Sequence, residues 1–69
     1  MGKKLVKLTD EFGRAVYIAP DTVSMLEPKM ICASNGEVVD GTRISTAYGM
    51  LIEVVESIET VLMAFAEEV

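Results

Sequence analysis

The dipeptide Asn35-Gly36 lies between two short runs rich in apolar side chains, residues 30–33 and 37–39. Asn-Gly is the strongest short signal for a β-hairpin, because both residues accept the left-handed backbone that a type I′ turn requires. A chain with this signal at its centre is expected to pair the two runs as antiparallel strands. We therefore predict a hairpin that turns at Asn35 and Gly36 with type I′ geometry.

A second hairpin is predicted nearer the N-terminus. Residues 4–9 alternate partly between polar and apolar side chains, and residues 14–18 carry the β-branched and aromatic side chains typical of a strand. Between these runs, Gly13 can supply the positive φ of a turn. Pro20 ends the second strand, and residues 23–26 are ambiguous between a helical turn and a strand.

The spacing of apolar residues changes after residue 46. At about 100° per residue, the apolar side chains fall within one arc roughly 120° wide, and Glu53, Glu56 and Glu67 fall opposite. Ser45 or Thr46 is a plausible N-cap. The pattern predicts one long amphipathic helix that begins between Ser45 and Tyr48. Its apolar arc contains Ala47, Leu51, Val54, Val55, Ile58, Val61, Leu62 and Phe65.

The predicted fold class is α+β, in one domain of 69 residues. A small antiparallel sheet of two hairpins, with three to five strands, occupies residues 1–46, and a long C-terminal amphipathic helix occupies residues 47–69. A helix of this length spans about 30 Å, whereas strands of five or six residues span about 17–20 Å. Since the distal helix would extend past the sheet, we expect a homo-oligomer, most simply a dimer. The expected self-association residues are Ile58, Val61, Leu62 and Phe65.

Composition removes several classes of function. The chain has one cysteine, Cys32, and no histidine. It therefore lacks an internal disulfide, the usual ligands of zinc and haem, and any Ser-His-Asp or Cys-His catalytic set. No Walker loop, GxGxxG, C-x-x-C or GxSxG motif occurs. We expect a non-catalytic protein without cofactor or metal, in which Cys32 acts as a small buried hydrophobe.

The whole net charge of −5 lies in the C-terminal segment. Residues 1–46 contain six bases and six acids, whereas residues 47–69 contain five acids and no base. This distribution argues against nucleic acid and against an anionic membrane as partners. Lys7 interrupts the first apolar residues, so no signal-peptide core forms, and Glu53 lies within the longest apolar region, which argues against a membrane span. We expect a cytoplasmic protein.

Two charged groups are candidate partner-binding residues. Lys3, Lys4 and Lys7 form the only basic cluster, with Arg14 close by across the first hairpin. A cluster of this size is usually a solvated edge that prevents strand-to-strand aggregation, and acids on the polar side of a helix are usually a solvated face. A partner of opposite charge would contact these same surfaces. The acidic candidates are Glu53 and Glu56.

The order of several short segments resembles the small FlbD/SwrD-like flagellar proteins and their uncharacterised short relatives. Those proteins have an L-T…G…I-N-P-D-x-V opening, a strand, an N-G turn, a further strand and a terminal helix. The resemblance covers residues 4–60 and implies a small accessory protein without known catalysis. The chain departs from the pattern in its longer, more apolar helix and in residues 40–43, which interrupt the last strand. The matching segments are Leu5-Val6-Lys7-Leu8-Thr9-Asp10 with Gly13, Val16-Tyr17-Ile18-Ala19-Pro20-Asp21-Thr22-Val23, Asn35-Gly36, Val38-Val39, and Val54-Val55 with Ile58.

Two classes of function are compatible with these features. The first is a small non-catalytic protein-interaction module, an oligomeric regulator or inhibitor whose acidic and apolar surface binds another protein; accessory factors and phage-encoded inhibitors are of this kind. The alternative is an oligomeric ligand-binding module with inter-subunit pockets for a small molecule or nucleotide. Its candidate residues are Tyr17, Tyr48, Arg14 and Arg43.

Overall fold

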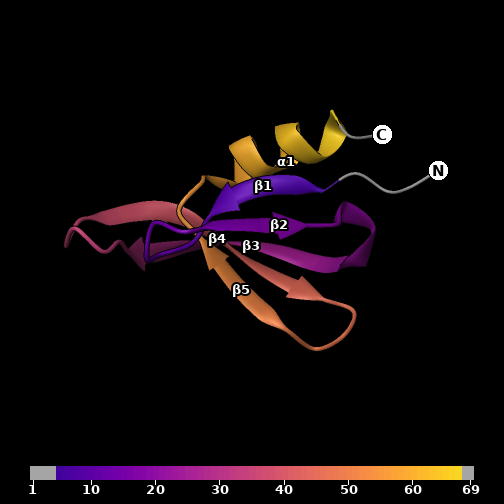
Figure 1. Ribbon diagram of the computed structural model, residues 1–69, viewed down its shortest axis with the longest axis horizontal. Helices are drawn as coiled ribbons and strands as arrows, with labels where there is room; N and C mark the ends of the chain where they lie inside the picture. Colours follow the sequence, from indigo (N-terminus) through magenta and orange to yellow (C-terminus); the bar gives the residue numbers. More distant parts are fainter. Residues whose placement is uncertain (1–4, 68–69) are drawn as a thin grey trace.

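The computed structural model describes residues 5–67. Two antiparallel sheets and one C-terminal helix give an α+β fold (Figure 1). The fold class is as predicted, but the single sheet expected from the sequence is divided into two. The first sheet pairs β1 with β2, and the second has the strand order β3-β4-β5. The elements are β1 (Val6–Thr9), β2 (Ala15–Ile18), the 3-10 turn η1 (Pro20–Thr22), β3 (Val23–Cys32), β4 (Val38–Thr46), β5 (Leu51–Val54) and α1 (Ile58–Ala66).

Both predicted hairpins are present. In the first, Val6 pairs with Ile18 and Leu8 with Val16, so the alternating apolar residues of β1 lie on one face of the sheet. In the second, β3 pairs with β4 over most of its length. The ambiguous residues 23–26 belong to β3, and residues 40–43 continue β4 without interruption, which corrects the predicted break there.

Three hairpins close with the same three-residue loop. In each, the residue before the loop donates its N–H to the carbonyl of the residue four positions later. Its own carbonyl accepts the N–H of the glycine that ends the loop, and all these bonds are 2.8–3.1 Å long. These glycines have φ between 81° and 89°, whereas no non-glycine residue among those described has a positive φ. Asn35 is therefore not left-handed, and the predicted type I′ turn is wrong: a three-residue loop with a left-handed glycine replaces it. The three sets are Asp10, Gly13 and Arg14; Ala33, Gly36 and Glu37; and Thr46, Gly49 and Met50.

The predicted helix start is also wrong. Residues 47–49 form the third hairpin loop and Leu51–Val54 form β5, so α1 is nine residues long. The Oγ1 of Thr46 accepts the N–H groups of Tyr48 and Met50, at 3.3 and 3.2 Å, and thus favours a loop over a helix N-terminus. The helix is capped instead by Ser57, whose Oγ accepts the N–H of Thr60 at 3.3 Å.

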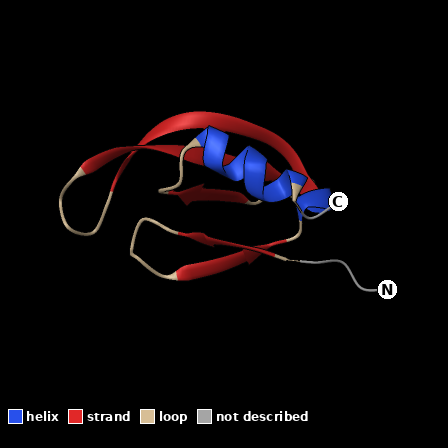
Figure 2. Ribbon diagram, turned by 90° about the horizontal axis from the view of Figure 1, so that it is seen from above, coloured by secondary structure: helices blue, strands red, loops and turns tan. Residues whose placement is uncertain are grey.

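The helix is too short to extend past the sheet as predicted, so an overhanging apolar stripe is not a basis for self-association. Nine residues rise about 14 Å, which is less than the length of β3 or β4. The helix contacts β1, β3 and β4, and Figure 2 shows it lying across the three-stranded sheet with the β1–β2 hairpin to one side. Self-association therefore needs another structural basis.

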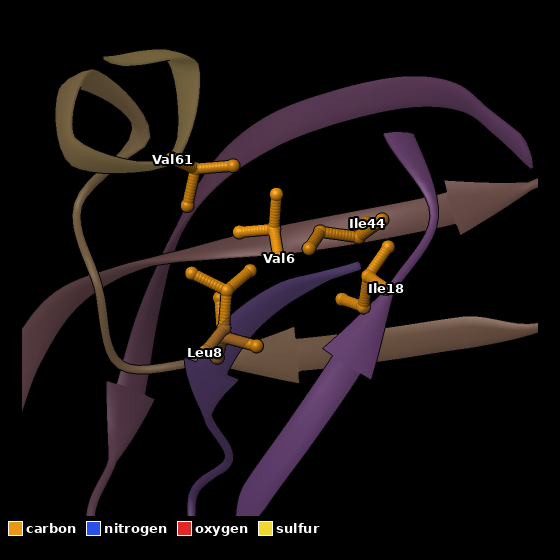
Figure 3. Packing of buried hydrophobic residues seen from close by; sticks show 6 residues of the cluster. Val6, Leu8, Ile18, Ile44 and Val61 are labelled. Atoms are coloured by element: carbon orange, nitrogen blue, oxygen red, sulfur yellow. The ribbon is translucent and has the colours of Figure 1, made fainter. Parts of the chain in front are cut away.

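The core lies where the two sheets and the helix meet. Val61 of α1 points toward Val6, with Ile44 and Ile18 beyond it (Figure 3). Val61, Ile44 and Val54 are fully buried. Burial of such side chains is the main source of stability in a chain of this size. The core cluster is Val6, Leu8, Ile18, Ile44, Val54 and Val61.

The junction between β5 and α1 joins the two sheets. The N–H of Val55 donates to the carbonyl of Thr9 at 2.9 Å, and the N–H of Thr9 donates to Oε1 of Glu56 at 2.9 Å. The buried hydroxyl of Thr42 donates to the carbonyl of Glu56, also at 2.9 Å. These bonds fix the end of β1 and the middle of β4 to the two residues before the helix cap.

Candidate interaction surfaces

The predicted self-association residues do not share one exposed stripe. Val61 is fully buried in the core, and Phe65 is partly buried against it. Ile58 is also partly buried. Leu62 is 51% exposed and its neighbour Met63 is 65% exposed. The exposed apolar surface of the helix therefore centres on Leu62 and Met63.

The basic candidates are only partly placed by the structure. Lys3 and Lys4 lie outside the described residues. Lys7 is exposed on β1, opposite Tyr17. Arg14 contacts its own loop: its Nε lies 3.3 Å from Oδ2 of Asp10, and its guanidinium lies 5.1 Å from the centroid of the Phe12 ring.

Asp10 is held ionised by its loop. Its Oδ1 accepts the backbone N–H groups of Arg14 and Phe12, both at 2.9 Å. The N–H of Arg14 makes the largest contribution to lowering the pKa of Asp10. Desolvation, the next largest effect, opposes it, and the N–H of Phe12 and the Arg14 guanidinium lower the pKa further. Asp10 and Arg14 thus stabilise the first hairpin loop.

The two acidic candidates lie in different environments. Glu53 is on β5 and pairs in register with Arg43 of β4. Glu56 accepts the N–H of Thr9 and therefore acts as a structural link between β1 and the start of the helix. The helical spacing predicted Glu56 on a solvated face. Its contact with Thr9 joins residues 47 positions apart and therefore has no local signal in the sequence.

The residues suggested for a ligand pocket do not converge within one chain. Tyr17 and Arg14 belong to the first hairpin, whereas Tyr48 and Arg43 belong to the three-stranded sheet and its loop. Arg43 is already paired, since its Nε lies 2.9 Å from Oε1 of Glu27.

The outer face of the three-stranded sheet carries two rows of side chains. Ile44 faces the core, so its neighbours Arg43 and Ser45 point to the opposite side. In register with them, the first row is Glu27, Arg43 and Glu53, and the second is Met25, Ser45 and Leu51. Met25 and Leu51 are 48% and 65% exposed, and flank the small side chain of Ser45. This face was not predicted, because the expected long helix included Leu51, which lies in β5.

A second concave surface lies between the start of α1 and the β3–β4 hairpin. It encloses about 350 Å³ and is lined by residues 28–30, 40–41 and 57–59. Cys32, further along β3, is exposed, which corrects the prediction that it is buried. No group of three or more metal-ligating side chains occurs among residues 5–67.

No helix within the described part of the chain is long and apolar enough to cross a membrane. Comparisons of the sequence and the structure with protein-family models, curated proteins and solved structures found no match.

Proposed function

We propose that the chain is a small, cytoplasmic, non-catalytic protein-interaction module, a regulator or inhibitor that binds another protein through the outer face of its three-stranded sheet. The observation that supports this function is the exposed pair Met25 and Leu51 on either side of Ser45. Two large apolar side chains on an uncovered sheet face lose favourable burial unless a partner covers them.

The surroundings of this pair are those of an interface. Tyr48, in the adjoining β4–β5 loop, is 79% exposed, and Met50 is 59% exposed. Aromatic residues and methionine are enriched at protein interfaces, and the charged row Glu27, Arg43 and Glu53 supplies a polar rim. The resemblance to the FlbD/SwrD-like proteins stays a prediction, and its implied accessory role is compatible with this proposal.

Affinity capture with a matched pair of variants tests the proposal. The test bait carries Met25→Ser with Leu51→Ser, and the control bait carries Leu5→Ser with Tyr17→Ser, two exposed apolar residues on the first hairpin. We expect a protein that is captured by the wild type and by the control to be lost with the test bait. Circular dichroism confirms that both baits are folded. Capture of the same proteins by both baits would contradict the outer face as the binding surface.

A further inference from the structure

The groove between α1 and the β3–β4 hairpin has an apolar floor that no part of the described chain covers. Pro28, Met30 and Ile58 line it, and Met30 is 59% exposed. A volume of about 350 Å³ lies at the lower end of the range for ligand sites, and suits one or two side chains better than a whole small molecule.

One wall of the groove is the outer edge of β3, which pairs with no other strand among the described residues. The N–H of Ala33 bonds to the carbonyl of Glu37, and such pairs alternate along antiparallel strands with pairs that do not bond each other. Cys32 and Met30 therefore direct their N–H and C=O groups away from β4. The same alternation places Pro28, which has no N–H to donate, at an outward position. An added strand could thus pair along Met30 to Cys32 but not past Pro28.

The charged residues that line the groove are Asp40, Glu59 and Lys29. Asp40 pairs in register with Met30 and shares its face of the sheet, and Glu59 lies in the first turn of the helix. Lys29 also lines the groove, although the alternation of side chains along a strand makes its side chain leave β3 from the face opposite to that of Met30. Neither Asp40 nor Glu59 forms an ion pair with another described residue.

From this arrangement we infer that the groove binds an extended segment of a partner protein that carries an arginine or lysine side chain. The segment adds a short strand to β3 at Met30 to Cys32, which is a common mode of peptide recognition. The aliphatic part of the basic side chain packs on Pro28, Met30 and Ile58, and its charged end lies between Asp40 and Glu59. The inference goes beyond the proposed function, because it concerns a different surface and does not require the outer face.

A titration of the ¹⁵N-labelled chain with the probe peptide acetyl-Thr-Val-Arg-Val-Thr-amide, followed by NMR, tests the inference. We expect saturable shifts at the backbone amides of Met30, Asp40, Gly41 and Glu59. The same peptide with citrulline in place of arginine keeps the shape but loses the charge, and should bind about tenfold more weakly, the value expected for two partly exposed ion pairs.

Matched variants distinguish the effect of the two groove carboxylates on binding from the effect of the overall charge of the chain. Asp40→Asn with Glu59→Gln should weaken binding of the arginine peptide by the same factor of about ten. The control, Glu37→Gln with Glu67→Gln, removes two exposed charges elsewhere and should leave binding within about twofold. Unchanged amide shifts outside the groove confirm that each variant is folded.

Three results would overturn the inference. The first is equal binding of the arginine and citrulline peptides, and the second is the absence of shifts at the groove. The third is the appearance of the same shifts when the chain alone is concentrated, which would assign the groove to a second copy. In the second case, shifts at Met25 and Leu51 would leave the proposed function in place.

Discussion

The Oε1 atom of Glu56 accepts the backbone N–H of Thr9 at 2.9 Å. Thr9 ends β1 and Glu56 follows β5, so one carboxylate joins the first strand to the segment that leads into the helix. The neighbouring bond from Val55 N–H to the carbonyl of Thr9 leaves both backbone groups of Thr9 paired at this junction. The first hairpin is thus fixed to the rest of the molecule by polar contacts as well as by the apolar core.

Replacing Glu56 by Ala should destabilise the fold by about 1–2 kcal/mol, because the partly buried N–H of Thr9 loses its acceptor. Glu56→Gln keeps an acceptor oxygen and should cost less. Urea unfolding measures both variants, with Glu11→Ala as a control for loss of an acidic side chain. Equal stability of Glu56→Ala and the wild type would contradict the structural role of this carboxylate.

The two N-terminal hairpins could be predicted because their signals are local. Gly13, Pro20 and Asn35-Gly36 act on the backbone within a few residues, and their positions matched the observed loops. The turn type at Asn35 was wrong because the same dipeptide also fits a three-residue loop whose glycine alone is left-handed.

The predicted helix start was wrong because the apolar residues of the strand β5 and of the helix α1, taken together, also fit a helical spacing. Val54, Val61 and Phe65 do face the core, as the helical arc requires, but Val54 reaches it from a strand. Ile52, which falls outside the helical arc, packs against the same core and marks the alternation of β5. Gly49, three residues after Thr46, repeats the spacing of Asp10 and Gly13, and this repeat is the signal that could have revealed the third hairpin. The contacts of Glu56 had no such signal.

Gly41 is the position on β4 that accepts no larger residue. A Cβ atom there would overlap the carbonyl oxygen of Val54 and the Cγ1 of Ile31. Since the first of these is backbone, Gly41→Ala should destabilise the protein by about 1–3 kcal/mol. Thermal unfolding monitored by circular dichroism measures the change, and Ser45→Ala on the outer face of the same strand serves as the control. A Gly41→Ala variant as stable as the control would show that β4 and β5 can separate at little cost.

At Gly36, the backbone conformation that each residue type prefers should by itself determine the cost of a substitution. Its φ is 89°, and nothing lies within 4 Å of an added Cβ atom. Gly36→Val should therefore cost about 1 kcal/mol or more, because a β-branched residue is strained in the left-handed region. Gly36→Asn should cost less, since Asn adopts this region more readily. If urea midpoints show both variants equal to the wild type, the left-handed conformation at Gly36 is not required.

Because of Asp10, the free energy of unfolding should depend on pH in the acidic range. Because its pKa is lowered in the folded protein, its contribution is complete above the unfolded value of about 3.8 and is lost as the pH falls through the lower folded value. Asp10→Asn retains an acceptor for the N–H groups of Phe12 and Arg14 but cannot carry the charge. The wild type should be more stable at neutral pH, and the two proteins should converge below pH 3.8. Urea midpoints over this range measure the difference, with Glu11→Gln as a charge control. A difference that does not change with pH would contradict the effect.

Self-association, which we still predict, now depends on one flank of the short helix. Ile58, Leu62 and Phe65 are spaced at i, i+4 and i+7, so they share that flank, and Leu62 is the most exposed of the three. Two copies crossing at this flank would bury Leu62 together with the exposed side chain of Met63.

Light scattering coupled to size-exclusion chromatography at micromolar concentration measures the mass. The wild type should exceed the monomer mass of 7.5 kDa, and Leu62→Ser with Met63→Ser should lower the measured mass without unfolding the sheets. Val61→Ala is the matched control on the buried side of the same helix: it should reduce stability by removing core contacts while the folded fraction keeps the wild-type mass. A wild type that elutes as a stable monomer would refute the prediction, and would mean that Leu62 and Met63 are tolerated in water because burial of Val61 and Phe65 alone holds the helix in place.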